Sequence, residues 1–195
     1  MIHSPRFTVV LDSCVLYPAP VRDILLNLAE QDLFKPKWTK EIHEEWMKNL
    51  LKNRKDLKRN QLEASVEAMN SAFPDSIVEN YSSLVSTLGL PDLKDRHVLA
   101  AAIRCKADLV VTYNTKDFPY EQLNPFDIDI QHPDEFISNL IDLNHEKAIK
   151  AFQNQVRKLK NPPMTTPEVL ESLRKCGLEQ SIEKFKNVLG KPIAD

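Results

Sequence analysis

The sequence predicts an α/β fold built on a central parallel sheet. Two short runs, residues 7–11 (FTVVL) and 109–113 (LVVTY), are apolar and rich in β-branched side chains, without alternating polar positions. This composition is typical of strands that are buried on both faces of a parallel sheet. Segments with helical spacing of apolar residues lie between and after the two runs, so helices are expected around such a sheet.

Each predicted strand is followed directly by polar residues. Asp12 closes the first run, and the turn Asn114-Thr115-Lys116-Asp117 follows the second. In parallel α/β sheets, ligands bind in the crevice outside the carboxyl ends of the strands. If the two strands are neighbours, Asp12 and Asp117 face one crevice.

A helix that begins after Thr39 carries a third acid. Thr39 is a suitable N-cap, and apolar residues follow at helical spacing, at Ile42, Trp46 and Leu50. At about 100° per residue, Glu45 lies at the edge of this apolar stripe and Glu44 points to the opposite side. Helical phase therefore favours Glu45 as the inward acid.

A fourth acid opens another helix, after Pro91. Asp92 is the predicted N-cap and Asp95 follows three residues later. Asp95 shares a face with apolar residues of this helix, among them Val98, Leu99 and Ala102. We therefore expect Asp95 to point toward the sheet and Asp92 to lie at the rim.

Each of these acids alone has an ordinary structural explanation, in a turn, at a helix N-terminus or in solvent. The four together are harder to explain in that way, because clustered carboxylates repel and raise one another's pKa unless a cation neutralises them. A hard divalent cation such as Mg²⁺ prefers oxygen ligands of this kind. The pattern predicts a metal site made from Asp12, Glu45, Asp95 and Asp117.

The four motifs, in this order, resemble a known family. They are VVLDSCVL around Asp12, TKEIHEEW around Glu45, PDLKDRHVLAAA around Asp95 and VTYNTKDFP around Asp117. Over about residues 6–142 the chain resembles PIN-domain nucleases, and in particular the VapC-type toxins of bacterial toxin–antitoxin pairs.

The resemblance implies a PIN-like three-layer α/β/α sandwich and one or two Mg²⁺ or Mn²⁺ ions held by the four acids. It implies an endoribonuclease that hydrolyses RNA phosphodiester bonds, inhibited by a cognate antitoxin protein, and it admits a homodimer. Further side chains are expected to assist through indirect or water-mediated contacts: Asp92, Asn114, Thr112 and Ser13. Many relatives carry an acid where Asn114 stands, so a second metal is expected to bind more weakly here.

Two other functions remain open. A housekeeping or structure-specific RNA or DNA nuclease would use the same chemistry on another substrate. A non-catalytic nucleic-acid-binding module with a degenerate PIN site is the third option, and retention of all four acids argues against it.

A basic segment follows the helix of Glu45. Six cations stand against the single acid Asp56, namely Lys48, Lys52, Arg54, Lys55, Lys58 and Arg59. A solvated connection between helices and a surface that contacts RNA phosphates are almost equally good interpretations. The position next to a metal-binding helix slightly favours RNA binding.

The chain is expected to divide into a PIN-like nuclease domain, residues 1–142, and a helical C-terminal extension, residues 143–195. The extension carries ten basic and six acidic residues, whereas residues 1–142 carry sixteen and twenty-two. Thr166-Pro167 is expected to begin one of its helices and Gly177 to end it. The extension either packs on the main domain or offers a surface to RNA or a partner.

Composition excludes several other classes. The chain has 195 residues, 42% of them hydrophobic, and a net charge of −2, so it can bury a full core but is not a general polyanion binder. Three glycines allow no phosphate-binding glycine-rich loop, and three cysteines without metal-type spacing argue against a zinc centre or a disulfide framework. No stretch approaches a membrane span, and the cytoplasm is the expected location.

Overall fold

The computed structural model describes residues 7–190, which form two compact units. The first unit comprises residues 7–17 and 35–131, and the second comprises residues 18–34 and 132–190. A domain boundary at residue 142 stays a prediction, but residues 18–34 and 132–142 group with the C-terminal helices. Each unit has its own set of elements.

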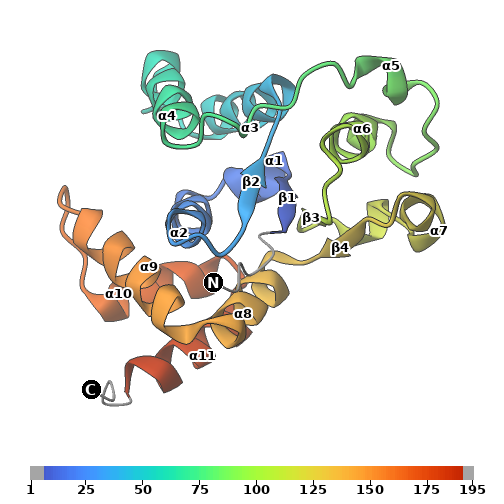
Figure 1. Cartoon of the computed structure of the whole chain (residues 1–195). Helices are drawn as coiled ribbons and strands as arrows, with labels where there is room; N and C mark the ends of the chain where they lie inside the picture. The colour runs from blue at the N-terminus through green and yellow to red at the C-terminus, as the bar shows by residue number, and fades with distance from the viewer. Residues whose placement is uncertain (1–6, 191–195) are drawn as a thin grey trace. The chain divides into compact units, whose positions relative to one another are not determined.

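The first unit contains the whole sheet and most of the helices that lie between its strands in the sequence (Figure 1). Its elements, in chain order, are β1 (Thr8–Leu11), α1 (Ser13–Leu16), β2 (Lys35–Lys37), α3 (Lys40–Asn53), α4 (Arg59–Ala72), α5 (Ser82–Val85), the 3₁₀ turn η1 (Leu93–Asp95), α6 (Arg96–Cys105), β3 (Leu109–Val111), η2 (Thr115–Asp117), α7 (Tyr120–Leu123), η3 (Asn124–Phe126) and β4 (Asp129–Gln131).

The sheet is parallel throughout, with the strand order β2-β1-β3-β4. Val10 of β1 pairs with Val110 of β3 and Leu11 pairs with Val111, so the two strands expected from the sequence are neighbours in register. The chain runs from β1 to β2 on one side and returns to β3 on the other, which places a topological switch point between β1 and β3. The predicted α/β fold with a central parallel sheet is confirmed.

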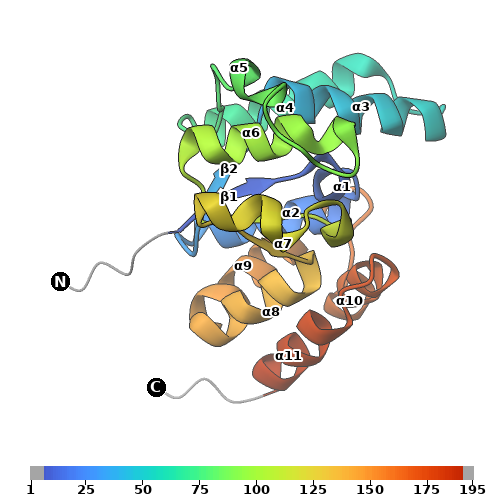
Figure 2. The ribbon, with the colours of Figure 1, turned by 90° about the vertical axis from the view of Figure 1, so that its right-hand side faces the viewer.

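Local sequence explains where the helices of this unit begin and how they pack. The Thr39 hydroxyl accepts a hydrogen bond from the Ile42 amide at 3.0 Å, so α3 begins at the expected cap. Trp38 and Trp46 are fully buried, and the Trp38 indole donates to Asn70 of α4 at 2.9 Å. Figure 2 shows the resulting arrangement, with α3 and α4 side by side and α5 next to α6.

In the residues that the structure describes, all the named elements of the second unit are helices. Its helices are α2 (Ala19–Glu30), α8 (Pro133–Leu143), α9 (His145–Lys158), α10 (Thr166–Lys175) and α11 (Glu179–Leu189). The helix α10 begins at Thr166, and the preceding residue, Thr165, is its N-cap, in a capping box with Glu168; Gly177 follows the helix with a φ of +80°.

A buried carboxylate joins two helices of this unit. Asp134, in the first turn of α8, is 6% exposed and lies at the N-terminus of α11. It accepts hydrogen bonds from the backbone amides of Gln180 at 2.9 Å and Ser181 at 2.8 Å, and from the Ser181 hydroxyl at 2.7 Å. These donors satisfy the charge where the helix dipole also favours it.

None of the helices described between residues 7 and 190 is long and apolar enough to cross a bilayer.

Candidate metal centre

Asp12 is the most firmly held of the predicted ligands. It follows β1 directly, caps α1 and is 4% exposed. Its Oδ1 accepts the Ser13 amide at 2.5 Å, and its Oδ2 accepts the Thr112 hydroxyl at 2.7 Å and the Cys14 thiol at 3.1 Å. The carboxylate is thus held in one orientation by two donors from α1 and by Thr112, which directly follows β3.

Glu45 and Glu44 occupy the sides of α3 that helical phase predicts. Glu45 is half-buried, with one third of its side chain exposed, and its Oε1 lies 3.0 Å from Nε2 of the buried His97. Glu44 is 55% exposed and accepts two hydrogen bonds from Arg59 of α4. Of these two acids, Glu45 is therefore the one that points toward the helix that begins after Asp95.

Asp95 shows that the acids share one electrostatic environment. It stands at the junction of η1 and α6, half-buried, and its Oδ2 is buried without a hydrogen-bond partner. Burial, followed by the charges of Asp12, Asp92, Asp117 and Glu45, raises the pKa of Asp95 to about 6. An unpartnered carboxylate oxygen among other acids is the environment that a cation would relieve.

Asp117 comes from the turn after β3. It closes η2 and is half-buried, while Asn114 at the start of the same turn is exposed. The backbone amide of Asn114 donates to the Thr112 hydroxyl at 3.0 Å, and the backbone amide of Asp117 donates to the backbone carbonyl of Asn114 at 3.0 Å. These bonds tie the turn to Thr112, which itself holds Asp12.

Asp92 acts on the backbone instead of pointing toward another acid. Its Oδ1 accepts the Lys94 amide at 2.9 Å and so caps η1, and the side chain is exposed. Its charge nevertheless contributes to the raised pKa of Asp95.

The donor set fits a hard divalent cation in chemistry and topology. Four carboxylates, which supply the oxygen ligands that such cations prefer, follow two adjacent parallel strands or lie on two helical segments of the same unit. Within residues 7–190, however, no three His, Cys, Asp or Glu side chains stand close enough together to chelate an ion as they are. The acids interact through their charges across the crevice, and mutual repulsion opposes a closer approach.

Sequence reasoning missed the role of Cys14. Its thiol donates to Asp12, lies 3.2 Å from the Thr112 hydroxyl and accepts a hydrogen bond from the Tyr113 backbone amide at 3.2 Å. Burial and the Asp12 charge raise the pKa of the thiol to about 12, so Cys14 acts as a neutral donor. Its position two residues after Asp12, in the first turn of α1, was the available signal.

The basic segment contains two kinds of cation. Arg54 pairs with Asp56 at 2.6 Å, and Arg59 pairs with Glu44 and Glu63 at 2.7 and 2.8 Å. The remaining cations form no ion pair with any described residue, and we call them the lysine group: Lys48, Lys52, Lys55 and Lys58. Their charges are uncompensated at the surface.

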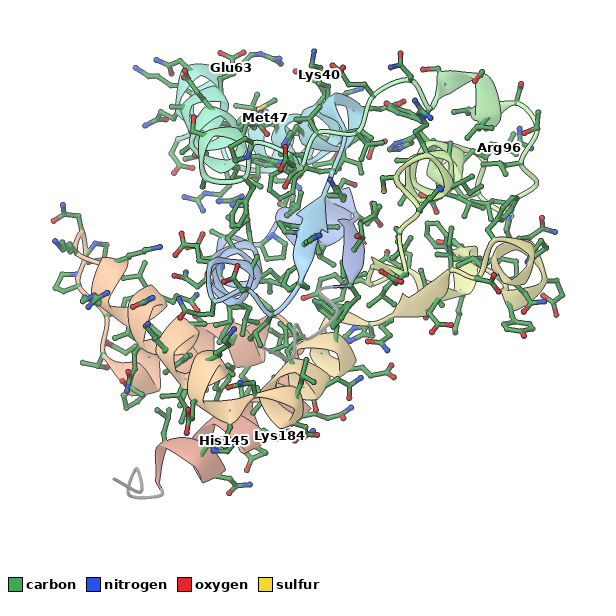
Figure 3. The ribbon with its side chains drawn as sticks, viewed as in Figure 1. Lys40, Met47, Glu63, Arg96, His145 and Lys184 are labelled. Carbon is green, nitrogen blue, oxygen red and sulfur yellow. The ribbon has the colours of Figure 1, made fainter. Side chains whose placement is uncertain are left out.

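A separate cleft of about 550 Å³ lies between α3 and α4. Figure 3 labels three of its lining residues, Lys40 and Met47 on α3 and Glu63 on α4. None of the four predicted ligands lines this cleft. Its walls belong to the opposite side of α3 from Glu45, because Glu44 is among them.

Comparison with known proteins agrees with the geometry. The PIN domain family model matches residues 8–116, and the VapC50 C-terminal domain model matches residues 133–186. The chain is 38% identical over 110 residues to the protein named "Putative ribonuclease VapC50" of Mycobacterium tuberculosis (strain ATCC 25618 / H37Rv), a stretch that covers 56% of this chain and 64% of that relative. The chain thus spans less than two thirds of the relative's length. No solved structure matches the chain. The PIN model covers more than half of the sequence, and Asp12 and Asp117 follow the adjacent parallel strands β1 and β3. This chain therefore belongs to the PIN-domain family.

Proposed function

We propose that this protein is a divalent-metal-dependent endoribonuclease that hydrolyses RNA phosphodiester bonds. The observation that carries the proposal is Asp95, a half-buried carboxylate with one buried oxygen that has no hydrogen-bond partner, whose pKa is raised by burial and by the charges of neighbouring acids. Such a cluster is costly to keep without a function for its charge. PIN-domain membership and a relative named as a ribonuclease support the same reaction.

Asp12, Glu45, Asp95 and Asp117 would hold one or two Mg²⁺ or Mn²⁺ ions. An ion held there would supply Lewis-acid chemistry, which would lower the pKa of a water and neutralise charge on the phosphate. Asp12 contributes an orientation set by three hydrogen bonds. Asp95 contributes a desolvated oxygen that needs no hydrogen bond to be broken before it binds.

The lysine group is the proposed path for the RNA backbone. Uncompensated lysines attract phosphates and release counterions on association, whereas the paired Arg54 and Arg59 are already neutralised by acids. These lysines lie on and just after α3, the helix that carries Glu45. The RNA would then be oriented with a phosphodiester beside the carboxylates.

We further propose that the protein is the toxin of a cytoplasmic toxin–antitoxin pair, inhibited by a cognate antitoxin and able to form a homodimer. The relative bears the name of a VapC protein, and a second family model matches the C-terminal helices. Co-expression with the protein encoded by the neighbouring gene tests this: relief of growth arrest supports a toxin pair, and no growth arrest on expression contradicts it.

Cleavage of RNA by purified protein tests the enzymatic proposal. Total RNA is incubated with the wild type and with Asp12→Asn, in EDTA and in Mg²⁺ or Mn²⁺, and new ends are mapped. Metal-dependent ends with the wild type alone support the proposal. RNA binding without new ends under any metal would instead indicate a non-catalytic module.

A further inference from the structure

A buried histidine connects the two helices that carry the helical acids of the candidate metal centre. His97 lies on α6, two residues after Asp95, and is 5% exposed. Its Nε2 lies 3.0 Å from Oε1 of Glu45, which belongs to α3. Because a carboxylate can only accept, Nε2 carries the proton and donates this bond.

The same imidazole faces a second acid of α3. Its Nδ1 lies 3.8 Å from Oε2 of Glu41, one helical turn before Glu45, and the Tyr81 hydroxyl donates to the same Glu41 oxygen at 3.1 Å. The side chains thus form a series from the surface to the site, Tyr81, Glu41, His97 and Glu45. His97 lies between two like charges on one helix face.

Glu45 needs such a partner more than Asp12 does. A glutamate with one third of its side chain exposed has several rotamers, and ordering it costs entropy. Asp12 is held by three donors, whereas His97 is the hydrogen-bond partner that the structure gives the Glu45 carboxylate. With Oε1 held, Oε2 remains to bind a ligand in a fixed direction.

We propose that His97 is a positioning residue that holds Glu45 at a set distance from Asp95, so that both carboxylates ligate the same ion. This inference rests on the proposed metal-dependent function. Hydrogen bonds to ligating carboxylates typically change metal affinity about 10–100-fold when they are removed. A purely space-filling role for His97 would change folding stability without changing metal affinity.

The test compares two substitutions of similar size by isothermal titration of the metal-free protein with Mn²⁺. His97→Gln keeps an N–H donor at nearly the position of Nε2, and His97→Leu removes it. We expect His97→Leu to weaken Mn²⁺ binding about 10–100-fold and His97→Gln to recover most of the affinity. In cleavage assays, kcat at fixed Mn²⁺ should fall for His97→Leu while KM for RNA stays near the wild-type value.

A matched control separates positioning from packing. His43 is 2% exposed, lies on α3 and accepts the Trp46 indole N–H at 3.0 Å. His43→Leu should lower stability in denaturant and leave the Mn²⁺ affinity of the folded protein unchanged. If His97→Leu fails to fold, His97→Asn, whose amide is too short to reach Glu45, is compared with His97→Gln in the same way.

A double-mutant cycle identifies the group through which His97 acts. In a Glu45→Gln background, His97→Leu should cause no further loss of Mn²⁺ affinity, because the carboxylate that it positions is already absent. Equal Mn²⁺ affinity of His97→Leu and the wild type, or equal loss in His97→Leu and His97→Gln, overturns the inference while the nuclease proposal stands. A wild-type protein that binds no Mn²⁺ and cleaves no RNA overturns both.

Discussion

Neutralising Asp95 should stabilise the metal-free protein at neutral and alkaline pH. Asp95→Asn keeps the shape of the side chain and removes the charge that burial and four neighbouring acids oppose. A pKa raised from 3.8 to about 6 means that folding favours the protonated acid. The charged form therefore costs stability that the amide does not.

The size of the effect follows from the pKa. A rise of about two units corresponds to about 3 kcal/mol, and solvent screening of a half-buried group reduces this to about 1–2 kcal/mol. The lost interaction between the Asp95 charge and the N-terminus of α6 opposes it by about 0.3–1 kcal/mol. We expect a net gain of about 1 kcal/mol at pH 8 for Asp95→Asn.

The pH dependence of stability gives a second check on the sign of the difference between Asp95→Asn and the wild type. Below about pH 4 the acid is protonated in the folded and the unfolded protein. There, the charge of Asp95 should make no difference between the stabilities of the wild type and Asp95→Asn. Between about pH 4 and 6 the wild type loses stability as pH rises, and above that the difference is constant. Asp95→Asn lacks this loss.

Chemical denaturation in EDTA, followed by tryptophan fluorescence, measures the difference in the free energy of unfolding between the wild type and Asp95→Asn. The signal comes from the first structural unit, which contains Asp95. The chain has two tryptophans, Trp38 and Trp46, and both are buried in the same unit as Asp95. Glu67→Gln, which neutralises an exposed acid of α4, is the matched control and should be silent. Excess Mn²⁺ should reverse the order, because at a hundred times Kd it stabilises a binding protein by about 2.7 kcal/mol. Equal or lower stability of Asp95→Asn at pH 8, or a difference that does not vary with pH, would refute the reasoning.

Three further changes have defined outcomes. Glu45→Gln should reduce cleavage at least about 100-fold and Glu44→Gln should leave it nearly unchanged, because only Glu45 points inward; similar losses in RNA cleavage assays would show that α3 is rotated. Converting the lysine group to glutamine should weaken RNA binding and flatten its salt dependence more than converting Arg54 and Arg59, since these arginines are already paired; filter binding at several salt concentrations decides. Asp134→Ala should destabilise the second unit by about 2–3 kcal/mol by leaving the N-terminal amides of α11 without acceptors, and unchanged hydrogen exchange in α11 would contradict this.

Much of the candidate site could be predicted because it depends on local rules. The apolar runs before Asp12 and Asp117 predict buried strands, and strand ends are where a parallel sheet binds ligands. The rotation of α3, which separates Glu45 from Glu44, follows from the period of the helix and the cap at Thr39. Chain direction and helical phase are properties of short segments, so residues close in sequence suffice to predict them.

Other features came from the tertiary structure. Residues 18–34 group with the C-terminal helices. The sequence could not predict this, because the pattern of apolar residues in a helix is the same whichever partner the helix packs against. The bond between His97 and Glu45 joins residues 52 positions apart, so no local pattern could predict it.

The sequence by itself determined which acids are available and which way each points from its own strand or helix. The tertiary structure decided that β1 and β3 are neighbours, that Thr112 and Cys14 hold Asp12, and that His97 reaches Glu45. The physical reason is that hydrogen bonds between distant segments depend on how strands and helices pack, and that packing is set by the whole core, not by any single segment.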